Sequence, residues 1–122
     1  MPEFLTGIDH IQIAAPPNSE EQARKFYGEL LRMKEIPKPE NLQGRGGCWF
    51  QCGAQEVHIG IQADFTPAKK AHPGFTVRAL EELKSRLIAS GYPITDEPPI
   101  AGRARFFTND PFGNRIEFLE FD

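Results

Sequence analysis

The sequence has 122 residues, of which 39% are hydrophobic and 25% charged, as in one compact folded domain and unlike an intrinsically disordered chain. Its formal net charge of −3 leaves no basic excess for phosphate contacts, so nucleic acid is not an expected partner. The apolar runs are too short to span a membrane, and residues 1–7 lack the basic and apolar regions of a signal peptide. We therefore expect a cytoplasmic protein.

The first half of the chain predicts a strand, a helix and three further strands. A strand over residues 8–15 alternates apolar and polar side chains and ends at two prolines. A helix over residues 19–33 begins at Ser19 and carries apolar residues at helical spacing. The elements that follow are a short strand over 34–36, a loop over 37–47, and strands over 48–52 and 56–62.

After a linker over residues 63–71, the same order of elements repeats. The predicted elements are a strand over 72–78, a helix from Leu80 that Gly91 ends, a Pro-interrupted edge strand over 94–100, a strand over 105–108, a hairpin loop over 109–114 and a last strand over 115–121. The sequence thus predicts two βαβββ modules, residues 1–63 and 64–122, within one α+β domain.

The three histidines and one glutamate occupy related places in the two halves. His10 and His72 fall in the first predicted strand of each half, and His58 and Glu117 fall in the last. All four lie opposite the apolar positions of their strands, so the apolar faces can pack on helices while these groups share the other face. Imidazole and carboxylate ligands suit Zn, Ni, Co, Fe or Mn. We predict one divalent metal per chain at these four residues.

Three segments resemble the vicinal oxygen chelate superfamily: GIDHIQIA at residues 7–14, ARKFYGELL at 23–31 and DPFGNRIEFLE at 110–120. This superfamily includes glyoxalase I, methylmalonyl-CoA epimerase, extradiol dioxygenases, fosfomycin-resistance thiol transferases and bleomycin-resistance proteins. The resemblance covers essentially the whole chain. Its motifs are specific for the superfamily and much less so for any one member.

The resemblance implies two βαβββ modules that form a half-open barrel around a divalent metal, in a homodimer. It matches His10 and His72 to the first-strand ligands and Glu117 to the last-strand carboxylate, which makes Glu117 the expected general base. His58 stands where glyoxalase I has a second glutamate and the epimerase a glutamine. Because the first and last strands of a module are neighbours in this fold, His10 and His58 are expected about 4.8 Å apart.

The resemblance leaves several reactions open. The leading interpretation is a glyoxalase-type lyase or isomerase whose small substrate chelates the metal through two neighbouring oxygens. An extradiol dioxygenase is an alternative, because two His and one carboxylate form the facial triad of Fe(II) oxygenases. A thiol transferase and a non-catalytic, drug-sequestering protein of the bleomycin-resistance kind are the others. Ala14 replaces an arginine that reaches glutathione in glyoxalase I, so the sequence does not predict glutathione as the thiol.

The remaining candidates are interpreted as structural. Four aromatic residues that could line a cleft are expected mainly to pack in the core: Trp49, Phe50, Phe106 and Phe107. Four basic residues and one carboxylate are expected to be solvated charges: Lys69, Lys70, Arg103, Arg105 and Glu120. The two cysteines, Cys48 and Cys52, lie about 13 Å apart along an extended strand, which is beyond disulfide reach and predicts two reduced thiols.

Overall fold

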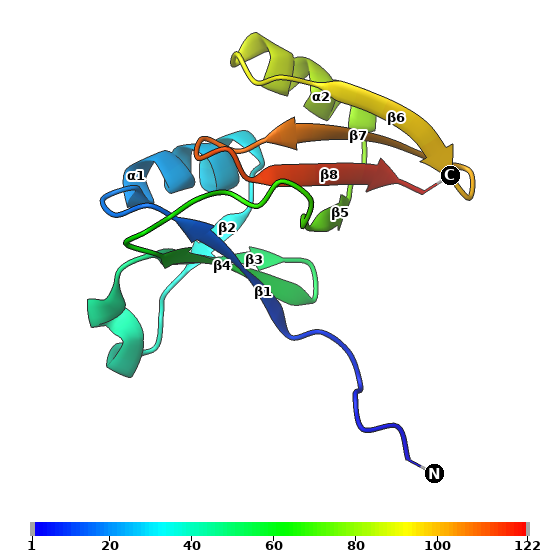
Figure 1. Ribbon diagram of the computed structural model, residues 1–122. Coiled ribbons are helices and arrows are strands. Elements are labelled where there is room, and N and C mark those ends of the chain that lie inside the picture. The colour runs from blue at the N-terminus through cyan, green and yellow to red at the C-terminus, as the bar shows by residue number, and fades with distance from the viewer. Residues whose placement is uncertain (1, 122) are drawn as a thin grey trace. The chain divides into compact units, whose positions relative to one another are not determined.

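The computed structural model describes residues 2–121 and divides the chain into two compact units, Met1–Ala63 (unit 1) and Asp64–Asp122 (unit 2). Each unit holds a four-stranded mixed sheet and one main helical segment (Figure 1). The α+β class and the two βαβββ modules expected from the sequence are confirmed. Within residues 2–121, no helix is both long enough and apolar enough to cross a membrane.

Unit 1 contains four strands in the order β1-β4-β3-β2. Strand β1 is parallel to β4, whereas the β4-β3 and β3-β2 pairs are antiparallel. In chain order the elements are β1 (His10–Ala15), α1 (Glu20–Ala23), the π-helix η1 (Arg24–Leu30), β2 (Lys34–Ile36), the 3-10 helix η2 (Glu40–Arg45), β3 (Cys48–Cys52) and β4 (Gln55–Ile61).

The predicted helix of unit 1 is α-helical only in its first turn and then widens into η1. Gly28 lies in the middle of this segment, and glycine lowers the propensity for an α-helix. A Cβ at Gly28 would lie 3.3 Å from the Phe50 ring, so glycine lets η1 approach the sheet closely. The loop predicted over 37–47 also differs, because it contains η2.

Unit 2 repeats the sheet order of unit 1, as β5-β8-β7-β6, again with the first strand parallel to the last. Its elements are β5 (Gly74–Thr76), α2 (Leu80–Ala89), β6 (Thr95–Ile100), β7 (Arg103–Asn109) and β8 (Arg115–Glu120). The first strand is shorter than predicted, and His72 precedes it instead of lying within it. Pro73 explains this correction, because proline has no N–H for a strand ladder and restricts the residue before it.

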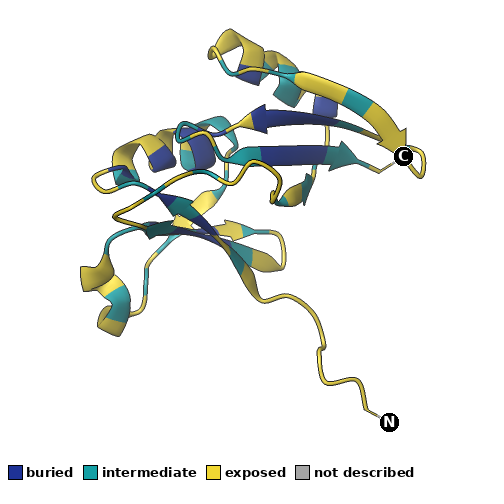
Figure 2. Ribbon diagram, in the orientation of Figure 1, coloured by how far each residue is buried: buried dark blue, intermediate teal, exposed yellow. Residues whose placement is uncertain are grey.

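Each sheet buries one face beneath its helix. In unit 1, η1 packs on β2 and β3, and Phe50 and Ile59 are buried; in unit 2, α2 contacts β8, and Phe106 and Ile116 are buried. Figure 2 shows the buried stretches of β7 and β8 in dark blue. The prediction of core packing is therefore right for Phe50 and Phe106, and Phe107 is buried as well. Trp49 and Phe107 alternate with them along β3 and β7 and lie on the opposite face, which is the face of the candidate donors.

Candidate functional site

The candidate donor on the last strand of each unit, His58 or Glu117, occupies the same place in its sheet. His58 on β4 lies opposite Gln12 on one side and Trp49 on the other. Glu117 on β8 lies opposite Gly74 and Phe107. His10 lies two residues before Gln12, which faces His58. His72 likewise lies two residues before Gly74, which faces Glu117. The two units therefore present their donor pairs in one common register.

In unit 1 the donors form part of a stack of three rings. The Trp49 and His58 rings are nearly parallel, at 2°, with centroids 3.6 Å apart, and the His10 ring stacks on His58 with centroids 4.2 Å apart. His58 is only 4% exposed as a result. The strands of His10 and His58 are neighbours as expected, but Glu56 and not His58 is the residue opposite His10. The rings meet because the two side chains lie diagonally on one face.

A carboxylate engages each histidine of unit 1. His10 Nδ1 lies 2.9 Å from an Asp9 carboxylate oxygen, and His58 Nε2 lies 2.9 Å from Glu56 Oε1. A carboxylate that accepts one ring N–H fixes the tautomer, and the other ring nitrogen keeps its lone pair. His10 would therefore offer Nε2 to a metal, and His58 would offer Nδ1.

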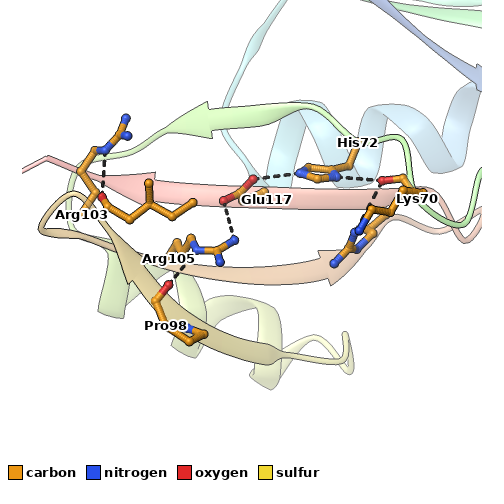
Figure 3. Close-up of polar contacts among 8 residues, drawn as sticks. Lys70, His72, Pro98, Arg103, Arg105 and Glu117 are labelled. Atoms are coloured by element: carbon orange, nitrogen blue, oxygen red, sulfur yellow. Dashed lines mark hydrogen bonds and ion pairs between the residues drawn. The ribbon is translucent and has the colours of Figure 1, made fainter.

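In unit 2 the donors belong to one polar network. His72 Nε2 lies 2.9 Å from Glu117 Oε1, and Arg105 Nη1 donates to Glu117 Oε2 at 3.1 Å (Figure 3). Arg105 is itself held by the Pro98 carbonyl, which accepts from its Nε at 2.8 Å. Glu117 is 7% exposed, so both oxygens of a nearly buried carboxylate are engaged. Such a group is held in one position by its partners.

The surroundings of His72 and Glu117 fit a metal-ligand pair. His72 Nδ1 lies 3.0 Å from the Lys70 carbonyl, a contact that orients the ring with Nε2 toward Glu117. Two ligand atoms at right angles and 2.0–2.2 Å from one metal are about 3 Å apart. The separation of 2.9 Å between His72 Nε2 and Glu117 Oε1 is that of a hydrogen bond, and two ligands of one metal could occupy the same positions.

The four predicted ligands are found as two pairs, one in each unit. Across residues 2–121, no three His, Cys, Asp or Glu side chains gather closely enough to hold a metal ion by themselves. Each unit thus contributes two candidate donors. His10 and His58 supply only nitrogen, whereas His72 and Glu117 supply one nitrogen and one oxygen.

Two charged residues have roles that the sequence reasoning missed. Arg105, expected to be a solvated charge, is largely buried against Glu117. Arg105 lies two residues before Phe107 on β7, so both lie on the donor face. This alternation along the strand could have predicted its position from the sequence. Glu120 accepts the backbone N–H groups of Ala79 and Leu80 at 3.1 and 2.9 Å and so caps the start of α2.

The cysteines are free thiols, as expected. Cys48 lies buried on β3, and burial raises the pKa of its thiol to about 11. Burial also raises the pKa of the Cys52 thiol. Because the thiolate is the reactive form, neither residue is a good nucleophile near neutral pH. The histidines and Glu117 therefore remain the candidate functional groups.

The sequence and the fold match a known family. The model of the Glyoxalase/Bleomycin resistance protein/Dioxygenase superfamily matches residues 7–118, and the chain belongs to this superfamily. The superfamily resemblance inferred from three sequence segments is therefore confirmed. No curated protein is significantly similar to the chain.

Several solved structures share the fold. A glyoxalase family protein from Bacillus anthracis is 53% identical, with a TM-score of 0.94 and full coverage of both chains. A glyoxalase/dioxygenase from Nostoc punctiforme is 18% identical, with a TM-score of 0.81, over 100% of this chain and 95% of that one. Lactoylglutathione lyase from Agrobacterium tumefaciens is 21% identical, with a TM-score of 0.72, over 95% and 94% of the two chains. The last two likenesses show the fold alone.

Proposed function

We propose that this protein is a glyoxalase-type, divalent-metal enzyme that moves a proton on a small substrate with two neighbouring oxygens. The observation that carries the proposal is the common register of the donor pairs, His10 with His58 and His72 with Glu117. A single pair of polar residues on one face of a sheet is common, but its recurrence at equivalent positions in both units favours a shared function. Membership of a superfamily that contains lyases supports the same reading.

In this proposal the four donors hold one divalent metal, supplied by one chain or by the two chains of a homodimer. A divalent metal held there would act as a Lewis acid toward a substrate bearing two adjacent oxygens. Asp9 and Glu56 orient the imidazoles of unit 1, and the Lys70 carbonyl orients His72. These contacts preset the ring nitrogens, so little reorganisation accompanies binding.

Glu117 is the residue placed to move the proton. It is the one carboxylate among the four donors, and Arg105 anchors its Oε2. Oε1 is therefore the oxygen that faces the reacting side, next to His72 Nε2. Removing a positioned general base costs about 10²–10⁴-fold in rate. Glu117→Gln should keep much of the metal affinity, because an amide oxygen still coordinates, and should lose this factor in rate.

The test is a Zn²⁺ titration followed by the emission of Trp49, the single tryptophan of the chain. Trp49 stacks on His58, so an ion that engages His58 should change its emission saturably, at one ion per chain. His72→Ala removes a donor of unit 2 and should move the Trp49 midpoint to at least tenfold higher Zn²⁺. Glu82→Gln, an exposed carboxylate change on α2, is the control and should leave the midpoint unchanged.

Two results would contradict the proposal. An unchanged midpoint in His72→Ala would mean that the two pairs do not share a metal, and the absence of any saturable change would contradict metal binding altogether.

Turnover is then screened on α-oxoaldehyde–thiol adducts, acyl-CoA epimers and catechols, with and without O₂. A requirement for O₂ would replace the proton-transfer reading with the dioxygenase reading. Light scattering at micromolar concentration measures the expected homodimer.

A further inference from the structure

Unit 2 contains a pocket of about 400 Å³ beside its donor pair. One wall is the donor face of the sheet, because Thr95 lies opposite Phe107, and Phe107 lies opposite Glu117. The next row of that face adds Asn109 and Arg115, which lie opposite each other. Residues 66–69 of the linker before β5 form the other wall. The volume is that of a typical small-molecule site.

The pocket is basic although the protein is acidic overall. Arg115 and Lys69 are its two charged lining residues, and none of its lining residues is acidic. The chain as a whole carries a net charge of −3. The hydroxyls of Thr66 and Thr95 and the amide of Asn109 add hydrogen-bonding groups to the same lining. Such a lining is complementary to an anion.

The guanidinium of Arg115 is held in place for recognition. Its Cζ lies 4.0 Å from the centroid of the Phe107 ring, within the range of a cation–π contact. Its Nη1 lies 3.5 Å from the Lys70 carbonyl, which is at the limit of a hydrogen bond. Most of its donors are thus left for another partner. A stacked guanidinium presents two parallel N–H groups, which match the oxygens of a carboxylate or phosphate.

Phe107 connects this pocket to the donor pair. Its ring meets the His72 ring edge to face, with centroids 4.9 Å apart, while Arg115 covers it as well. A ligand bound by Arg115 would therefore lie one aromatic ring away from His72. One small molecule could therefore place an acidic group at Arg115 and a reacting group near His72.

We propose that this pocket binds the oxyanion end of the substrate, a carboxylate or a phosphate-type group, through Arg115 and Lys69. The inference rests on the proposed function, because it makes the substrate a small organic acid whose two neighbouring oxygens face His72 and Glu117. It also names Arg115 and Lys69 as specificity-determining residues.

The test uses the protein without metal and two simple probes, acetate and inorganic phosphate, titrated at constant ionic strength with chloride as the balancing anion. Binding is followed by NMR shifts of the amides of Phe107 and Asn109 and of the Arg115 side chain. We expect saturable shifts in this pocket. Arg115→Gln should weaken binding by roughly tenfold or more, because a charge-assisted pair is lost, and Lys69→Gln should weaken it less.

A matched control separates local recognition from general charge. Arg103→Gln removes the same charge from an arginine of β7 that does not line the pocket, and it should not alter the affinity. Tighter binding of acetate assigns a carboxylate, and tighter binding of phosphate assigns a phosphate-type group. Equal affinity in all the folded variants, or no saturable shift with either probe, would overturn the proposal. Because no metal is present, anion binding that persists while the Zn²⁺ titration fails would refute the proposed function alone.

Discussion

In unit 1 the candidate donors are two imidazoles in a ring stack, whereas in unit 2 they are an imidazole and a carboxylate in an ionic network. Trp49 covers His58 with its face, and Phe107, its counterpart on β7, meets His72 with its edge. Arg105 stands two residues before Phe107 and holds Glu117. The backbone register is thus common to both units, while the surroundings of the donors differ.

The position equivalent to Arg105 in unit 1 is Gly47, two residues before Trp49. Gly47 has a left-handed φ of 84°, and its N–H donates to Glu20 of α1 at 2.9 Å. A backbone so close to the sheet leaves no room for a side chain. Unit 1 therefore has no side chain at the position where unit 2 has Arg105, because its chain turns sharply at that point. The difference in chemistry follows from one difference in backbone path.

The largest expected effect comes from Gly47→Ala. The new Cβ would lie 2.1 Å from the Ile59 carbonyl oxygen, in a backbone conformation that alanine already disfavours. We expect unit 1 to lose about 3 kcal/mol or more of stability, measured by urea unfolding with Trp49 emission. Gly44→Ala is the control, because no atom lies within 4 Å of its added Cβ. An equal loss in both variants would contradict the close approach at Gly47.

A smaller effect is expected from Arg105→Met, which leaves one oxygen of the buried Glu117 carboxylate without its donor. The free energy of unfolding should fall by about 2 kcal/mol. The double variant Arg105→Met/Glu117→Gln should recover part of that loss, because the unpaired charge is gone. Arg103→Met, on the same strand, should cost less than about 0.5 kcal/mol. No recovery in the double variant would mean that Arg105 acts by packing.

The smallest effect is expected from Glu20→Gln. The Gly47 N–H is the main cause that holds the pKa of the Glu20 carboxyl below its ordinary value of 4.5. When the pKa is lower in the folded state, the carboxylate adds stability at pH values above its ordinary pKa. This contribution is lost as the pH falls through the lowered pKa. Glu20→Gln should therefore cost below about 1 kcal/mol at pH 7 and nothing in stronger acid. Glu21→Gln, an exposed neighbour, should show no such pH dependence.

Much of this architecture follows from patterns within single strands. Alternation along β4 and β8 places His58 and Glu117 opposite the apolar residues, and Gly91, with a φ of 86°, follows α2 as predicted. The offset between His10 and His58 was not predictable, because pairing register depends on the neighbouring strand and not on the strand itself. The role of Arg105 was missed for a related reason. Its partner lies on another strand, so composition alone makes it a surface charge.

The first strand of each unit is hydrogen-bonded to the last, so this pairing joins segments that are distant in the sequence. As unit 1 is synthesised, the apolar side chains of β1 emerge first, and their neighbours in β4 emerge only after the helices and two other strands. Contacts between distant segments form slowly, because the intervening chain must be ordered before they contribute stability. Strand β1 thus spends the longest time as an unprotected edge, which is the form most prone to aggregation. The pairing of β1 with β4 also brings the His10 ring onto His58, so these two rings meet only when this edge of the sheet is in place.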